Sequence, residues 1–127
     1  MNDHSRLERR RVLVVEDDWF IASYVTDALK QAGAAIMGPV TSASDALARL
    51  DEEPPPHAAT LNVRLLDGDS LPVAQRLAEL DVPFLFLSAH AAASLPPEMA
   101  ARPRLEKPFA GWEVVAAVGG MLDRQER

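Results

Sequence analysis

The chain alternates short apolar runs with longer stretches in which apolar residues recur at helical spacing. Residues 12–15 are apolar and mostly β-branched, which is typical of a strand buried on both faces of a parallel sheet. Residues 84–87 form a second, fully apolar run and predict another central strand. Three weaker strands are predicted over residues 34–40, 58–63 and 104–106, the last at an edge of the sheet.

Helices are predicted between these strands, over residues 19–32, 43–50, 71–80 and 109–124. The first helix should stop at Gly33, and Ser42 is expected to cap the second. Pro72 suits the first turn of the third helix, where a missing N–H costs nothing. Between residues 89 and 102, an alanine-rich stretch interrupted by two prolines predicts only a short or irregular helix.

The alternation of strand and helix predicts one α/β domain of the (βα)5 type. Its sheet should be parallel and covered by helices on both faces, with right-handed crossovers. No internal repeat and no second domain is visible. We expect residues 1–10 to be a disordered or extended lead-in and residues 11–127 to form the single domain. In such sheets, sites lie beyond the carboxyl ends of the strands.

Composition narrows the classes of function. The formal net charge of −6 argues against nucleic acid as a partner, because binding phosphate favours a basic face. The absence of cysteine excludes disulfides, thiolate metal sites and cysteine nucleophiles. No apolar stretch approaches the roughly 18–20 residues that a membrane span needs, and residues 1–11 lack the apolar region of a secretory signal. We therefore expect a cytoplasmic protein that binds neither nucleic acid nor membrane.

Polar side chains collect where the predicted strands end. In chain order, the strand ends carry Glu16-Asp17-Asp18, Asn62, Ser88 and Lys107-Pro108. Because the carboxyl ends of parallel strands share one edge of the sheet, acids, an amide, a hydroxyl and an ammonium should converge there. Such a set could hold a metal ion and a tetrahedral anion. Alternatively, Asp18 could cap the following helix, and Ser88 and Lys107 could be ordinary turn and surface residues.

Four segments in register resemble the motifs of the response-regulator receiver domains of two-component signalling. They are VLVVEDD at 12–18, LNVRLLDG at 61–68, LSA at 87–89 and KPF at 107–109. The resemblance covers about residues 11–124, nearly the whole chain. It implies a flavodoxin-like, doubly wound parallel five-stranded sheet with the strand order 2-1-3-4-5, and a role in phosphorelay signal transduction.

The resemblance also implies roles for the residues at the strand ends. For a Mg²⁺ ion it implies ligands from Asp17, Asp18, the phosphoacceptor position Asn62 and the backbone carbonyl of Arg64. For the phosphoryl group it implies two switch residues, the hydroxyl of Ser88 and the ammonium of Lys107. In this family the peptide bond after the lysine is usually cis.

Two positions depart from the family pattern. Asn62 stands where the phosphoacceptor aspartate belongs, and a neutral amide oxygen is a poor nucleophile, so no acyl phosphate is expected there. The exchange also removes one negative charge beside the metal, so Mg²⁺ should bind more weakly. Arg104 occupies the position of the aromatic residue that often moves with the switch hydroxyl, so that part of the switch should differ as well.

Three functional hypotheses follow. The first is a stand-alone pseudo-receiver, not an enzyme, that binds a sensor histidine kinase, a phosphotransfer protein or another signalling protein. The resemblance implies that partners, or a second copy in a homodimer, dock on the fourth helix, fifth strand and fifth helix. The second hypothesis is a conventional Mg²⁺-dependent receiver in which Asn62 replaces aspartate by engineering or in nature. The third, a small metal-dependent phosphatase with Asp17 or Asp18 as nucleophile, leaves little room for a substrate-closing cap.

Overall fold

The structure is a computed structural model that describes residues 6–88 and 102–125. The strands of its sheet are β1 (Arg11–Val15), β2 (Ala35–Val40), β3 (Ala58–Asn62), β6 (Phe84–Ser88) and β7 (Arg104–Glu106). The helices are α1 (Trp19–Gln31), α2 (Ala43–Glu52), α3 (Leu71–Glu79) and α5 (Gly111–Gln125). The short helix predicted between residues 89 and 102 falls almost wholly on residues 89–101, outside the described part of the chain.

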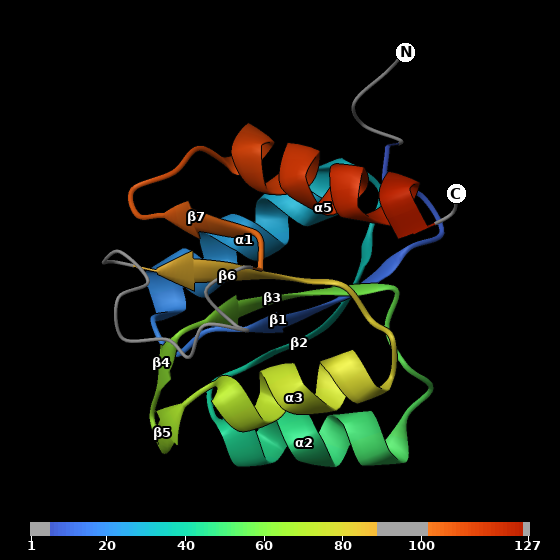
Figure 1. Cartoon of the computed structure of the whole chain (residues 1–127). Helices are drawn as coiled ribbons and strands as arrows, with labels where there is room; N and C mark the ends of the chain where they lie inside the picture. The colour runs from blue at the N-terminus through green and yellow to red at the C-terminus, as the bar shows by residue number, and fades with distance from the viewer. Residues whose placement is uncertain (1–5, 89–101, 126–127) are drawn as a thin grey trace.

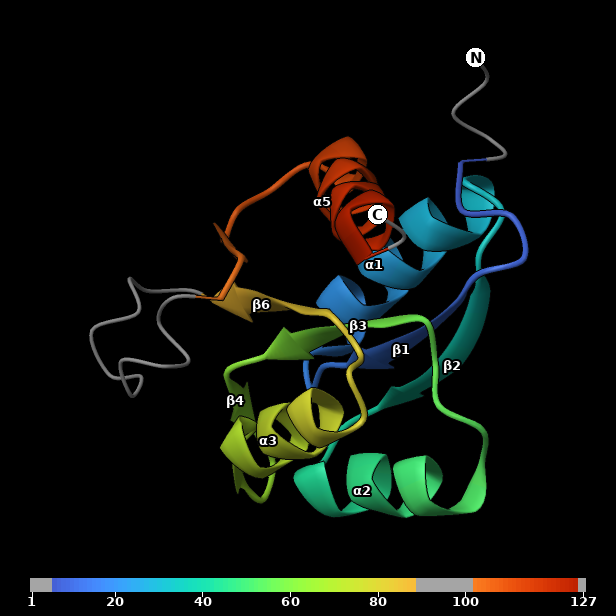
Figure 2. The same ribbon diagram turned by 45° about the vertical axis from the view of Figure 1, so that its right-hand side comes forward.

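The five strands are parallel and lie in the order β2-β1-β3-β6-β7. With β6 and β7 as the fourth and fifth strands, this confirms the predicted fold class and strand order. Helices α1 and α5 cover one face of the sheet, and α2 and α3 cover the other (Figures 1 and 2). The edge position predicted for residues 104–106 is also confirmed.

Each face of the sheet carries its own hydrophobic core. Along β1, Leu13 and Val15 face the α2–α3 layer, whereas Val12 and Val14 face the α1–α5 layer, and all four are buried. In β6, Phe84 and Phe86 pack edge to face in the α2–α3 layer, with ring centroids 5.5 Å apart. Apolar runs without alternation are what a strand needs when both of its faces are covered.

The segment before β1 differs from the expected lead-in. Residues 6–9 form turns, and Leu7 is buried in the α1–α5 core. Its N–H donates to the carbonyl of Ala32, 2.7 Å away. The guanidinium of Arg6 lies where a methyl group on Gly119 of α5 would stand, and it pairs with Asp123 at 3.7 Å. The expectation of a disordered or extended lead-in is therefore wrong for residues 6–10, which dock on the α1–α5 layer.

The segment between the predicted strand 58–63 and the predicted helix 71–80 contains a small antiparallel hairpin, β4 (Arg64–Leu65) and β5 (Gly68–Asp69). At its turn, the carboxylate of Asp67 accepts hydrogen bonds from the backbone N–H groups of Ala43 (2.8 Å) and Ser44 (3.1 Å). These are the first two residues of α2. The hydroxyl of Ser42 accepts from the N–H of Asp45 (3.1 Å), which confirms the predicted cap. The start of α2 is thus capped twice, once locally and once from the hairpin.

Asp67→Asn is expected to reduce stability at neutral pH and to change it little in acid. The backbone N–H groups of Ala43 and then Ser44 hold the pKa of Asp67 below its ordinary value of 3.8. The stabilising contribution of the carboxylate is therefore complete above pH 3.8 and is lost as the pH falls through the lower folded-state value. Urea unfolding at a series of pH values measures this. Asp27→Asn, at an exposed position of α1, is the control, and the same pH dependence in both variants would contradict the cap.

Candidate functional site

Four polar side chains meet beyond the carboxyl ends of β1 and β3. These two strands lie side by side in the sheet (Figure 1). Glu16 directly follows β1, and its N–H donates to the carbonyl of Val40 at 2.9 Å, so the strand path continues by one residue. This places its side chain inside the fold, with 1% exposed. Asp17 follows, Asn62 ends β3, and Lys107 follows β7. We call Glu16, Asp17, Asn62 and Lys107 the strand-end cluster.

Asn62 lies at the centre of the strand-end cluster. Its amide nitrogen donates to Oδ1 of Asp17, 3.0 Å away, and to the backbone carbonyl of Arg64. Its Oδ1 accepts a hydrogen bond from Nζ of Lys107 at 3.0 Å. The same ammonium donates to Oε1 of Glu16 at 3.1 Å. One amide therefore joins residues that are 45 positions away on either side in the sequence.

The ion pair between Glu16 and Lys107 is largely removed from water. The side chain of Glu16 is 1% exposed and that of Lys107 17%. Burial raises the pKa of Glu16 above its ordinary value of 4.5, and hydrogen bonds from the N–H of Asp18 and from Lys107 oppose this rise. A carboxylate in this position depends on its hydrogen-bond partners to remain charged.

Asp18 does not join the strand-end cluster, although the family resemblance placed it among the metal ligands. Its Oδ1 accepts from the N–H groups of Phe20 (2.9 Å) and Ile21 (3.2 Å), so its side chain caps α1 and is exposed. The acidic pair that points into the site is Glu16 and Asp17. The alternative given by the sequence, that Asp18 caps the following helix, is therefore confirmed, since an aspartate directly before the first helical residue is a preferred N-cap.

Two further residues assigned by the resemblance, Ser88 and Arg104, lie on β6 and β7. Ser88 ends β6 and is buried, and its backbone carbonyl accepts from the N–H of Lys107 at 2.7 Å. Arg104 begins the edge strand β7, where it is exposed and pairs in register with Phe86. The Lys107–Pro108 peptide bond is cis.

The donor set that the resemblance assigns to Mg²⁺ does not fit the ion in this arrangement. Oδ1 of Asp17 and the carbonyl oxygen of Arg64 both face the amide nitrogen of Asn62 at hydrogen-bond distance. Mg²⁺ requires oxygen ligands about 2.0–2.1 Å away, and an amide N–H group offers it none. Among residues 6–88 and 102–125, no three histidine or acidic side chains are grouped to hold a metal ion.

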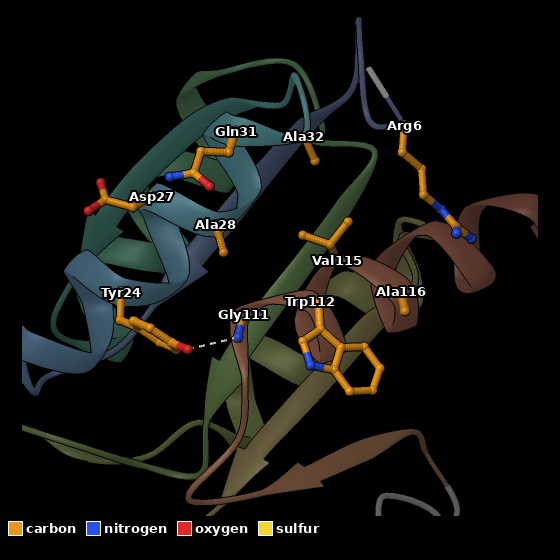
Figure 3. Close-up of a pocket in the computed structure, with 10 residues that line it drawn as sticks. All are labelled: Arg6, Tyr24, Asp27, Ala28, Gln31, Ala32, Gly111, Trp112, Val115 and Ala116. Atoms are coloured by element: carbon orange, nitrogen blue, oxygen red, sulfur yellow. Dashed lines mark hydrogen bonds between the residues drawn. The ribbon is translucent and has the colours of Figure 1, made fainter. Parts of the chain in front are cut away.

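A separate pocket of about 540 Å³ lies between α1 and α5 (Figure 3). The hydroxyl of Tyr24 closes one end by accepting a hydrogen bond from the N–H of Gly111 at 2.9 Å. Large apolar side chains are exposed on the same two helices: Trp112 and Trp19 at 73% each, Phe20 at 84% and Tyr24 at 50%. Sequence reasoning missed this surface, because these rings do not follow the helical periodicity of the core. Exposed apolar groups of this size often mark binding surfaces.

None of the helices in the described residues combines the length and the hydropathy needed to cross a bilayer.

The chain is similar to a curated transcriptional regulatory protein and to solved receiver-domain structures. No family model matches the chain. The chain is 32% identical over 120 residues to the transcriptional regulatory protein PrrA of Mycobacterium tuberculosis and to that of Mycobacterium bovis. The match covers 91% of this chain and 51% of PrrA, so the chain spans about half the length of these curated relatives.

Solved structures that match the chain over almost their full lengths include SdrG and the receiver domain of DrrB. SdrG from Sphingomonas melonis is 35% identical with a TM-score of 0.74, and the match covers 91% of this chain and 98% of SdrG. The beryllofluoride-activated receiver domain of DrrB is 25% identical with a TM-score of 0.76, at the same coverage of 91% and 98%.

Proposed function

The chain belongs to the response-regulator receiver domains of two-component signalling, and we propose that it signals there by binding another protein, without forming an aspartyl phosphate. Receiver domains are signalling domains that interact with histidine kinases and phosphotransfer proteins, and they generally bind Mg²⁺ at the phosphorylation site. The observation that carries the proposal is the position of Asn62. Its amide lies at the end of β3 between Asp17 and Lys107, where the family pattern requires a carboxylate.

The chemistry of the amide supports this proposal. An ionised carboxylate attacks a phosphoryl group with a charged oxygen, whereas Oδ1 of Asn62 is neutral. Its electron density is also directed to the ammonium of Lys107, 3.0 Å away. The lysine that would pair with a phosphoryl group is thus already bound to Asn62 and Glu16. In this proposal Ser88 and Lys107 keep their places in the fold but have no phosphoryl group to bind.

Protein binding is supported by the exposed surface of the described residues. Aromatic rings are enriched at the centres of protein interfaces, and Trp19, Phe20 and Trp112 are each more than 70% exposed at the beginnings of α1 and α5. The face formed by the fourth helix, fifth strand and fifth helix is described only for β7 and α5. The proposed partner is a histidine kinase, a phosphotransfer protein, another signalling protein or a second copy of the chain.

The proposal is tested by incubation with a small-molecule phosphodonor and MgCl₂, followed by intact-mass spectrometry. The unmodified chain should gain no phosphoryl group. Asn62→Asp is the matched variant, since it restores the charged oxygen in a side chain of the same size. Phosphorylation of Asn62→Asp alone would indicate that the surrounding site has kept its competence. An acid-stable, base-labile phosphoryl adduct on the unmodified chain would overturn the proposal and favour a conventional phosphorylated receiver.

A further inference from the structure

We infer that the carboxamide of Asn62 takes the place of a divalent cation, so that the strand-end cluster is assembled without metal and Mg²⁺ must displace an amide to enter. This inference rests on the proposed function in one respect, the position of Asn62 at the phosphoacceptor site. It goes further because it treats the amide nitrogen as a group that competes with the ion. In the simpler view, the neutral amide oxygen is a ligand that binds the ion weakly.

The orientation of the amide is determined by its neighbours. Lysine can only donate hydrogen bonds, so the atom that faces Nζ of Lys107 at 3.0 Å must be the amide oxygen. The carboxylate of Asp17 and the carbonyl of Arg64 can only accept, so the atom that faces both must be the amide nitrogen. The alternative flip would place two pairs of acceptors together and an NH₂ group against an ammonium. The N–H bonds therefore point at the two oxygens that a metal would need.

The charges of the strand-end cluster lead to the same conclusion. With asparagine at position 62, the ammonium of Lys107 pairs with the carboxylate of Glu16, and the carboxylate of Asp17 accepts from the amide nitrogen of Asn62. An aspartate there would add a third carboxylate to the cluster, and like charges at this spacing disfavour one another unless a cation lies between them. The amide removes one negative charge and presents two positively polarised hydrogens to the acceptors that remain. The amide hydrogens thus supply part of the positive charge that the cation would supply.

The competing explanation, in which the amide is merely a weak ligand, predicts the opposite effect of Asn62→Ala. If Asn62 blocks the ion, alanine frees Asp17 and the Arg64 carbonyl, and Mg²⁺ should bind more tightly to the variant than to the unmodified chain. If Asn62 contributes a ligand oxygen, alanine removes it, and binding should weaken or stay the same. The two explanations therefore differ in whether Asn62→Ala binds Mg²⁺ more tightly than the unmodified chain does.

The experiment is isothermal titration of MgCl₂ into the unmodified chain, Asn62→Ala and Asn62→Asp, with circular dichroism to establish that each is folded. We expect the affinity to increase from the unmodified chain to alanine by roughly tenfold, which corresponds to about 1.4 kcal/mol, and to increase again with aspartate. Binding to the unmodified chain as tight as, or tighter than, binding to Asn62→Ala would overturn the inference.

A second measurement does not depend on the alanine variant. The unfolding temperature of the unmodified chain should be the same in EDTA and in MgCl₂, whereas that of Asn62→Asp should rise in MgCl₂, because a ligand that binds only the folded state stabilises it. A rise in the unmodified chain equal to that of Asn62→Asp would also overturn the inference. Neither measurement involves a phosphodonor, so failure here leaves the proposed function standing, and an adduct in the labelling experiment leaves the metal result standing.

Discussion

Lys107→Met should lower the free energy of unfolding by about 3 kcal/mol, because it leaves a buried carboxylate without its cation. Nζ of Lys107 lies 3.1 Å from Oε1 of Glu16, whose side chain is only 1% exposed. Methionine keeps most of the length and volume of lysine, so the variant removes the charge and the hydrogen bonds but little packing. The expected loss lies at the low end of values for a broken buried pair, since the lysine side chain retains 17% exposure.

The loss in Lys107→Met should increase with pH. Burial already raises the pKa of Glu16 above 4.5, and removing the ammonium raises it further. The folded variant then holds a proton that the unfolded chain releases, so its stability is greatest below pH 4.5 and falls as the pH rises through the folded-state pKa. Urea unfolding at about pH 5 and about pH 8 measures the difference.

A second substitution separates the buried charge from other effects of losing the lysine. Glu16→Gln combined with Lys107→Met removes the unpaired carboxylate, so the double variant should recover most of the lost stability and should lose the added pH dependence. If Lys107→Met were as stable as the unmodified chain at the higher pH, the ion pair would contribute nothing to folding.

Leu7→Ala is expected to cost about 2–5 kcal/mol of unfolding free energy, which is the range for a leucine truncated inside a core. Leu7 is 1% exposed and packs with the apolar residues of the α1–α5 layer. Removing its side chain should also loosen the turn that holds Arg6 beside Gly119. Thermal or urea unfolding measures the cost.

The neighbouring substitution Glu8→Ala is the matched control for Leu7→Ala. Glu8 lies in the same turn but is exposed, so its loss should change stability by no more than about 0.5 kcal/mol. Equal effects of the two substitutions would indicate that the segment before β1 does not dock on the α1–α5 layer.

Much of the fold could be predicted because its signals are local. Residues 12–15 and 84–87 are apolar without alternation, a pattern typical of a strand that is covered on both faces. The central strands and the helical layers on both sides of the sheet could therefore be predicted. The convergence of Asn62 and Lys107 also followed, since parallel strands end at one edge.

The features that sequence reasoning missed depend on contacts between distant segments. Asp67 caps α2 from 24 residues away, and no local pattern distinguishes it from an ordinary turn residue. Leu7 is a single apolar residue among charged ones, so it produces no periodicity. Asp18 is a different case, because the sequence left both a helix cap and a metal ligand open. The N–H groups at the start of α1 are nearer than the cluster, and they donate to its Oδ1.

The two tryptophans of the chain, Trp19 and Trp112, lie at the surface, each 73% exposed. Indole emission shifts to shorter wavelength when water is excluded from the ring. Unfolding should therefore change the fluorescence of this protein very little, whereas a molecule that covers the beginnings of α1 and α5 should produce a blue shift. The chain carries an intrinsic optical reporter of association, available without any attached dye.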